Sequence, residues 1–160
     1  MKILIVEDRE ENIQAATKAL SNAHQLIIAR NYQEGIEALK KHSPVIAIID
    51  MHFPMNNGGA EEKLGCKFKE EVIFSMKVPI PVITMTSGKH REVPSSDIHF
   101  EIRFQQNQGA IGPHRVYTSG GDTKDRSTTW KRALGELLKD PARKLYIAAL
   151  EFKLMCAAST

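Results

Sequence analysis

The sequence predicts an α/β domain: a doubly wound sheet of five parallel strands, followed by an extra C-terminal helix. Two observations lead to this prediction. The runs Lys2–Val6 and Val45–Ile49 are short, apolar and rich in β-branched residues, as is typical of strands buried on both faces of a parallel sheet. Segments with helical periodicity alternate with strands over the first 50 residues. This β-α-β-α-β order calls for parallel strands joined by right-handed crossovers.

Caps and periodicity place the elements of the first 50 residues. Glu10 and Glu11 put acids in the first turn of a helix, where the helix dipole favours them. Asn31 and Glu34 have the spacing of a capping box, which opens a second helix. The inward stripes are Ile13, Ala16 and Leu20 in the first helix, and Tyr32, Ile36 and Leu39 in the second. We expect strands at 2–6, 25–29 and 45–50, and helices at 8–22 and 32–42.

After residue 60 the pattern is less regular. Glu61–Met76 is predicted to be a helix, although Gly65 inside it disfavours the helix. The remaining elements are predicted as a fourth strand at 82–86, an alternating edge strand at 99–104, a short fifth strand at 115–118, and helices from Ser127 to Asp140 and at 143–157. We assign residues 1–139 to the domain and 140–160 to a helical extension. Its stripe Leu145, Ala149, Phe152 and Cys156 either packs on the domain or forms a partner or dimer surface, whereas Trp130 and the Phe152 stripe are most simply core.

Acidic side chains follow two strands that are predicted to be neighbours. Glu7 and Asp8 end the first strand, and Asp50 ends the third. The carboxyl ends of parallel strands meet at one rim of the sheet, so we expect the three carboxylates to converge. They would repel one another unless a hard divalent cation joined them, and Mg²⁺ prefers such oxygen ligands. Thr86, at the end of the fourth strand, is expected on the same rim.

Composition excludes several classes of protein. The chain has 160 residues and a net charge of +3, which is too small to favour nucleic acid as a partner. We find no apolar stretch near the ~20 residues of a membrane span and no signal-peptide pattern, so we expect a cytoplasmic protein without a membrane partner. The basic excess lies in residues 86–160, which hold 12 basic and 8 acidic residues.

Three segments in register resemble the receiver domain of response regulators. Ile5–Asn12 resembles the acidic opening of that family, and Asp50 with Pro54 and Gly58-Gly59 resembles its phosphoacceptor loop. Pro81–Ser87 resembles its fourth strand, which ends in Thr or Ser. The likeness covers residues 1–88 and implies a flavodoxin-like receiver fold.

The resemblance also implies roles for individual residues. Asp50 would be the phosphoacceptor, and Glu7, Asp8, Asp50 and the backbone carbonyl of His52 would hold Mg²⁺. Thr86 would contact the phosphoryl group and act as the switch. The chain would then be a stand-alone receiver and not an enzyme, phosphorylated by a histidine kinase or phosphotransfer protein and signalling to a downstream protein target.

One part of the family pattern is missing, and other interpretations stay open. The family carries Lys-Pro at the end of its fifth strand, and this chain has no Lys-Pro; the loop residues Lys89 and Lys124 are the alternative cations. One rival function is a pseudo-receiver that binds partners without phosphorylation, and another is a Mg²⁺-dependent phosphotransfer enzyme or nuclease. The simpler roles are Asp8 as a helix N-cap, Asp50 as a loop acid and Thr86 as a structural hydroxyl.

Overall fold

The computed structural model describes residues 1–87, 98–106, 109–118 and 124–158, with side chains described for 1–85 and 124–158. The elements are β1 (Lys2–Val6), α1 (Glu10–Leu20), β2 (Gln25–Ala29), α2 (Tyr32–His42), β3 (Ile46–Asp50), β4 (Phe53–Pro54), β5 (Glu61–Glu62), α3 (Gly65–Lys67), the π-helix η1 (Phe68–Ile73), β6 (Val82–Ser87), β7 (Ile98–Gln106), β8 (Gly109–Thr118), α4 (Ser127–Leu138) and α5 (Pro141–Ala158).

The main sheet has six strands in the order β2-β1-β3-β6-β7-β8. Its first four strands are parallel, as the alternation of strands and helices predicts. Val6 lies opposite Ile49 between β1 and β3, and Asp50 lies opposite Met85 between β3 and β6. The acids that follow β1 and end β3 are therefore on adjacent strands at the same rim.

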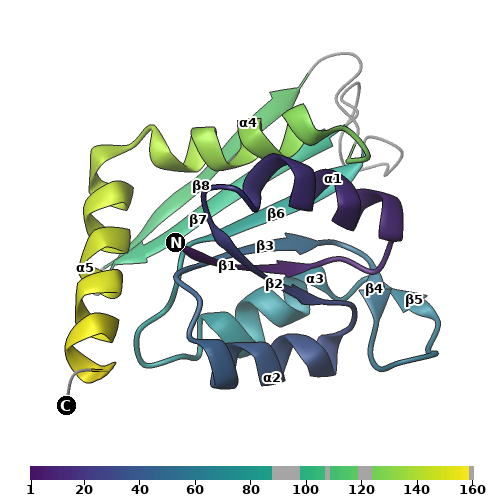
Figure 1. Ribbon diagram of the computed structural model, residues 1–160, viewed down its shortest axis with the longest axis horizontal. Helices are drawn as coiled ribbons and strands as arrows, with labels where there is room; N and C mark the ends of the chain where they lie inside the picture. The colour runs from purple at the N-terminus through teal and green to yellow at the C-terminus, as the bar shows by residue number, and fades with distance from the viewer. Residues whose placement is uncertain (88–97, 107–108, 119–123, 159–160) are drawn as a thin grey trace.

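Helices cover both faces of the parallel strands (Figure 1). On one face, Ile3, Ile5 and Ile48 pack in a core cluster with residues of α1 and α4. On the other face, Leu4 and Ile49 pack in a second cluster with residues of α2 and η1. Successive strand residues point to opposite faces, so a strand segment buried on both sides is apolar at every position, as Ile3–Val6 of β1 and Ile46–Ile49 of β3 are.

The prediction of five parallel strands is wrong beyond β6. The segment predicted as an edge strand is β7, which lies inside the sheet and pairs antiparallel with β6, Thr86 opposite His99. The predicted fifth strand lies within β8, which pairs antiparallel with β7 and so runs in the same direction as β6. β7 thus lies between β6 and the strand that contains the predicted fifth strand. The alternating pattern in β7 indicated a strand, but a period of two does not say which strand is its neighbour.

The prediction of one helix over Glu61–Met76 is also wrong in its bounds. Glu61–Glu62 pairs antiparallel with Phe53–Pro54 in a small two-stranded sheet, and helical backbone begins only at Gly65. Most of the helical stretch is the π-helix η1, which ends at Ile73. Leu64 and Phe68 of this segment are buried.

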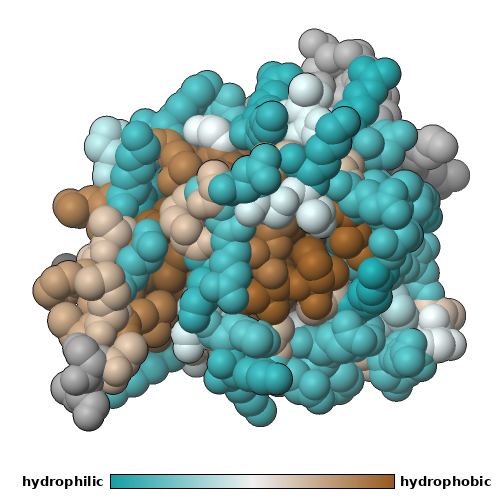
Figure 2. Space-filling model, in the orientation of Figure 1, coloured by the Kyte–Doolittle hydropathy of each residue, from teal (hydrophilic) through white to brown (hydrophobic). Residues whose placement is uncertain are grey.

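The two C-terminal helices differ in how they meet the core. Trp130 of α4 is buried at 2% exposure, as predicted. The interpretation of the α5 stripe as core is wrong, because Leu145 is 72% and Phe152 66% exposed and the helix packs through Ile147 instead; the alternative of a partner or dimer surface stays a prediction. Figure 2 shows apolar side chains gathered over α5 at the left of the view. In the described part of the chain, none of the helices is both long and apolar enough to span a membrane.

Candidate functional site

Three carboxylates converge at the carboxyl ends of β1 and β3. Glu7 and Asp8 follow β1, Asp50 is the last residue of β3, and these strands are parallel neighbours. One carboxylate oxygen from each of the three residues lies within 4.8 Å of the others. The three carboxylates therefore lie together as the strand ends predict, and carboxylate oxygens are the ligands that a hard divalent cation prefers.

Backbone hydrogen bonds hold two of these acids in place. The Glu7 amide donates to the carbonyl of Ala29 at 3.0 Å, and a Glu7 carboxylate oxygen accepts from the Arg9 amide at 3.1 Å. Asp50 Oδ1 accepts from the Met51 amide at 2.7 Å. Each bond uses a donor at the point where a strand ends, so the rim itself orients the carboxylates.

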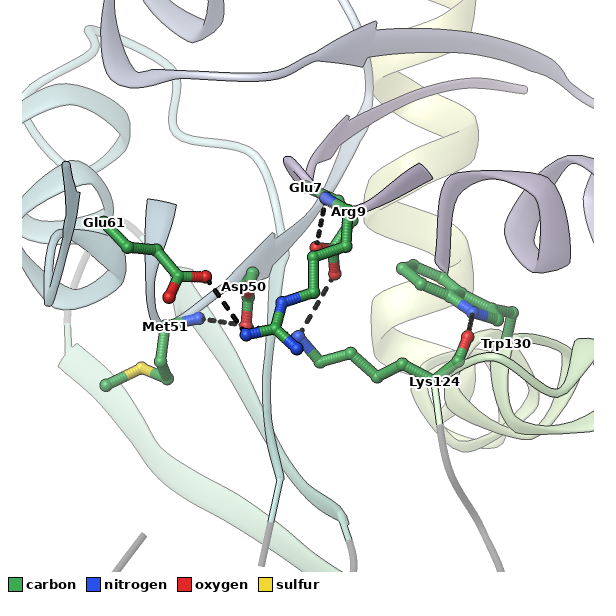
Figure 3. Close-up of polar contacts among 7 residues, drawn as sticks. All are labelled: Glu7, Arg9, Asp50, Met51, Glu61, Lys124 and Trp130. Carbon is green, nitrogen blue, oxygen red and sulfur yellow. Dashed lines mark hydrogen bonds and ion pairs between the residues drawn. The ribbon is translucent and has the colours of Figure 1, made fainter. Parts of the chain in front are cut away.

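Lys124 places a positive charge in direct contact with two of the acids (Figure 3). Its ammonium group lies 3.1 Å from Glu7 Oε2 and also contacts Asp50 Oδ1. The side chains are almost enclosed, with exposures of 9% for Lys124, 1% for Glu7 and 10% for Asp50. The sequence offered Lys124 only as one of two loop candidates, and the other, Lys89, lies outside the described residues.

Helix α4 fixes the backbone of that lysine. The Trp130 indole N–H donates to the Lys124 carbonyl at 2.7 Å, and Trp130 itself is buried in the core. Figure 3 shows the lysine side chain extending from this anchor toward Asp50. Trp130 was predicted as core alone, and neither its spacing nor its type marks it as a partner of a charged loop.

Burial dominates the electrostatics of the acids. Desolvation raises the pKa of Glu7, the charge of Asp50 raises it further, and the nearby ammonium of Lys124 opposes both effects. Desolvation also raises the pKa of Asp8, with additional contributions from the charges of Glu61 and Asp50. Both carboxylates therefore hold protons more readily than usual, and a bound cation would reverse that tendency.

Asp8 is not the N-cap of the first helix. The N-cap of α1 is Arg9, which makes no side-chain cap bond. Asp8 Oδ1 is instead buried without a hydrogen-bond partner in the described structure. A buried carboxylate oxygen that lacks a donor and faces two other acids fits a metal ligand, so the residues at this rim are compatible with Mg²⁺.

Gly65 allows α3 to pack directly on the loop that follows Asp50. Its amide donates to the Met51 carbonyl at 3.0 Å. A Cβ atom at this position would overlap the carbonyl oxygen of Asp50 and lie 2.8 Å from Met51 Cα. The sequence suggested only that Gly65 disfavours a helix, whereas the structure shows that it allows this close approach.

The roles of Thr86 in contacting a phosphoryl group and of the His52 carbonyl in binding a metal stay predictions. Thr86 lies in β6 next to Met85, which pairs with Asp50, but its side chain is outside the described residues. His52 follows Asp50 by two positions, in the connection between β3 and β4.

Comparisons with known proteins find little similarity in sequence. No protein-family model matches it, and no curated protein matches it. One similar solved structure is the co-crystal structure of the anti-anti-sigma factor PhyR complexed with the anti-sigma factor NepR from Bartonella quintana. The match has 16% sequence identity and a TM-score of 0.41, and it covers 84% of this chain and 47% of that chain. This chain thus spans about half the length of the chain it matches.

The parallel order β2-β1-β3-β6 is that of the flavodoxin-like doubly wound sheet, and the acids end its two central strands. The fold is α/β, with four parallel strands and helices on both faces of the sheet. The insertion of β7 next to β6 separates it from a regular five-stranded sheet.

Proposed function

We propose that this chain is an atypical receiver that accepts a phosphoryl group on Asp50 and signals through protein contacts. The observation that carries the proposal is the contact of Lys124 with both Glu7 and Asp50. A carboxylate that is to receive a phosphoryl group needs a cation beside it, because negative charge accumulates on the transferring oxygens. Lys124 supplies that cation although the Lys-Pro of the family is missing.

The acids at the rim support a metal site in the same proposal. Glu7, Asp8 and Asp50 would hold Mg²⁺, with the backbone carbonyl of His52 as a further ligand. The orphaned Asp8 oxygen is the feature that most favours a cation here. Bound Mg²⁺ would neutralise charge on the transferring group.

The proposed step is a displacement at phosphorus. An Asp50 oxygen forms a bond to the phosphorus of a phosphohistidine on a kinase or phosphotransfer protein. The phosphorus–nitrogen bond breaks, and the electron pair leaves on the histidine nitrogen. Lys124 would then pair with the new phosphoryl oxygens, and the Thr86 hydroxyl would donate to one of them.

Signalling through protein contacts is supported by the surface of α5. Within the described part of the chain, the large exposed apolar residues all lie on this helix: Leu145, Phe152, Leu154 and Met155. Apolar side chains in such a group are typical of an interaction surface. Whether a downstream target or a second copy of the chain covers it stays open in this proposal.

The test uses a small phosphodonor, acetyl phosphate, with Mg²⁺ and intact-mass measurement. We expect the wild-type chain to gain one phosphoryl group. Asp50→Asn should gain none, and Asp140→Asn, the same change at an acid far from β3 in the sequence, should behave as the wild type. Beryllofluoride with Mg²⁺ should shift the NMR signals of Asp50 and Thr86.

The rival functions are separate outcomes of this test. A folded chain that gains no phosphoryl group and does not respond to beryllofluoride is a pseudo-receiver. The strand β7, which remodels the sheet beyond β6, is the observation that favours this rival. Turnover of phosphate esters or nucleic acid that Asp50→Asn abolishes would instead identify a Mg²⁺-dependent enzyme.

A further inference from the structure

Lys124 is held at both of its ends by groups from different parts of the chain. At the side-chain end, the ammonium group contacts Glu7 and Asp50. At the backbone end, its carbonyl accepts the indole N–H of Trp130 at 2.7 Å. Figure 3 shows the two contacts on opposite ends of one residue.

The backbone contact is needed because of where Lys124 lies in the chain. It sits in the connection between β8, which ends at Thr118, and α4, which begins at Ser127. A lysine in a connection has a long flexible side chain and is usually hydrated, so reaching a fixed carboxylate requires that its backbone be fixed as well. The N-cap residue of α4, Arg126, makes no side-chain bond that would do this.

Trp130 is suited to fix that backbone because it does not move with the connection. It is 2% exposed and belongs to the core cluster that joins α1, α4 and the central strands. Its carbon atoms are packed in that cluster, and its single polar atom is directed at the Lys124 carbonyl. The buried indole thus restrains the position of the Lys124 peptide group in the loop.

We infer that Trp130 is a positioning residue, whose indole N–H holds Lys124 where its ammonium group can serve Asp50. This inference rests on the proposed function. It adds the explanation of how a loop lysine can take the place of the lysine that the family carries at the end of its fifth strand. Trp130 touches none of the reacting atoms, so it acts only through Lys124.

The test compares four proteins: wild type, Trp130→Phe, Lys124→Met and the double variant. Trp130→Phe keeps an aromatic ring in the core and removes the donor. We expect it to slow phosphorylation of Asp50 by acetyl phosphate about tenfold, since misplacing a catalytic group is costly. In the Lys124→Met background the same substitution should have no further effect, because the group that it positions is gone.

A structural role alone predicts a different result. In that case the effects of the two substitutions multiply, and Leu137→Ala, a buried change in α4 away from Lys124, slows phosphorylation as much as Trp130→Phe does. Either of these results, or a Trp130→Phe protein phosphorylated at the wild-type rate, overturns the inference.

Failure of the proposed function can be told apart from failure of the inference. If the wild-type chain gains no phosphoryl group, the proposed function fails. The same four proteins are then compared by urea unfolding. Free energies of unfolding that are coupled between positions 124 and 130 support the positioning role, and additive values overturn it.

Discussion

The two halves of this chain reach the rim of the sheet in different ways. In residues 1–87, the acids arrive at the ends of β1 and β3, adjacent parallel strands whose register brings the acids together. In residues 98–158, the cation arrives from the connection before α4, held by a core side chain. The main-sheet strands of the first half are all parallel, whereas β7 of the second half pairs antiparallel with its neighbours.

The difference shows that a functional side chain can be positioned by the end of a regular strand or by a loop that is hydrogen-bonded to the core. The first route leaves a signal in the sequence, because a strand is an apolar run and its end is visible. The second depends on one hydrogen bond between residues 124 and 130, which has no periodicity. Four tests, most of them with a matched control substitution, examine how far the halves differ and how they are joined.

The largest expected effect comes from cutting the link between the halves. Lys124→Met leaves Glu7 and Asp50 buried without their cation and should cost about 3 kcal/mol of unfolding free energy, measured with urea at pH 8 and with EDTA present. Lys139→Met removes the lysine of an ion pair with Glu136 that is 70% exposed on the lysine side, and should cost less than about 0.5 kcal/mol. Equal losses of unfolding free energy in the two variants would mean that the contacts of Lys124 with Glu7 and Asp50 add no more stability than an exposed ion pair.

The second test concerns which face of α5 joins the core. Ile147 is 2% exposed, so Ile147→Ala should cost about 3 kcal/mol in thermal or urea unfolding. Leu145 is 72% exposed, and Leu145→Ala should change stability by no more than about 0.5 kcal/mol. A larger loss of stability for Leu145→Ala than for Ile147→Ala would instead support the interpretation of the Leu145 stripe as core.

Two glycines, one in each half, give a smaller contrast. Gly65→Ala places a methyl group against the backbone of Asp50 and Met51 and should cost about 2 kcal/mol. Gly135 lies within α4 with nothing within 4 Å of an added Cβ, so Gly135→Ala should stabilise by about 0.5–1 kcal/mol. Both values come from urea unfolding, and a stable Gly65→Ala protein would contradict the close approach of α3.

The smallest effect is on the pH dependence of stability. The pKa of Glu7 in the folded chain is raised above its ordinary value of 4.5, so the folded state binds the proton more tightly than the unfolded state does. Stability from this group is therefore full below about pH 4.5 and is lost as the pH rises through the folded pKa. In EDTA, the wild type should lose stability over that range more steeply than Glu7→Gln. Parallel curves would show that Glu7 has no raised pKa.

Much of the first half could be predicted because each element carries its own signal. Asn31 accepts the Glu34 amide at 2.9 Å, as the capping-box spacing predicts, and α2 runs from Tyr32 to His42 as expected. The convergence of Glu7 and Asp50 followed from strand order alone.

The second half was harder to predict for physical reasons. The alternation in β7 predicts a strand but not that it lies between β6 and β8. In α5, an apolar stripe containing Phe152 and another containing Ile147 compete for the core, and periodicity cannot decide which one is covered. No pattern marks Lys124, because its place is set by a bond to a residue of the folded core.

Trp130 is the single tryptophan of the chain. Its indole N–H is bonded to the residue whose side chain contacts Asp50. The tryptophan fluorescence of the unlabelled protein therefore comes from one ring, and its emission wavelength will respond to movement of the Lys124 peptide. A fluorimeter can thus follow events around Asp50 in real time without any dye or isotope.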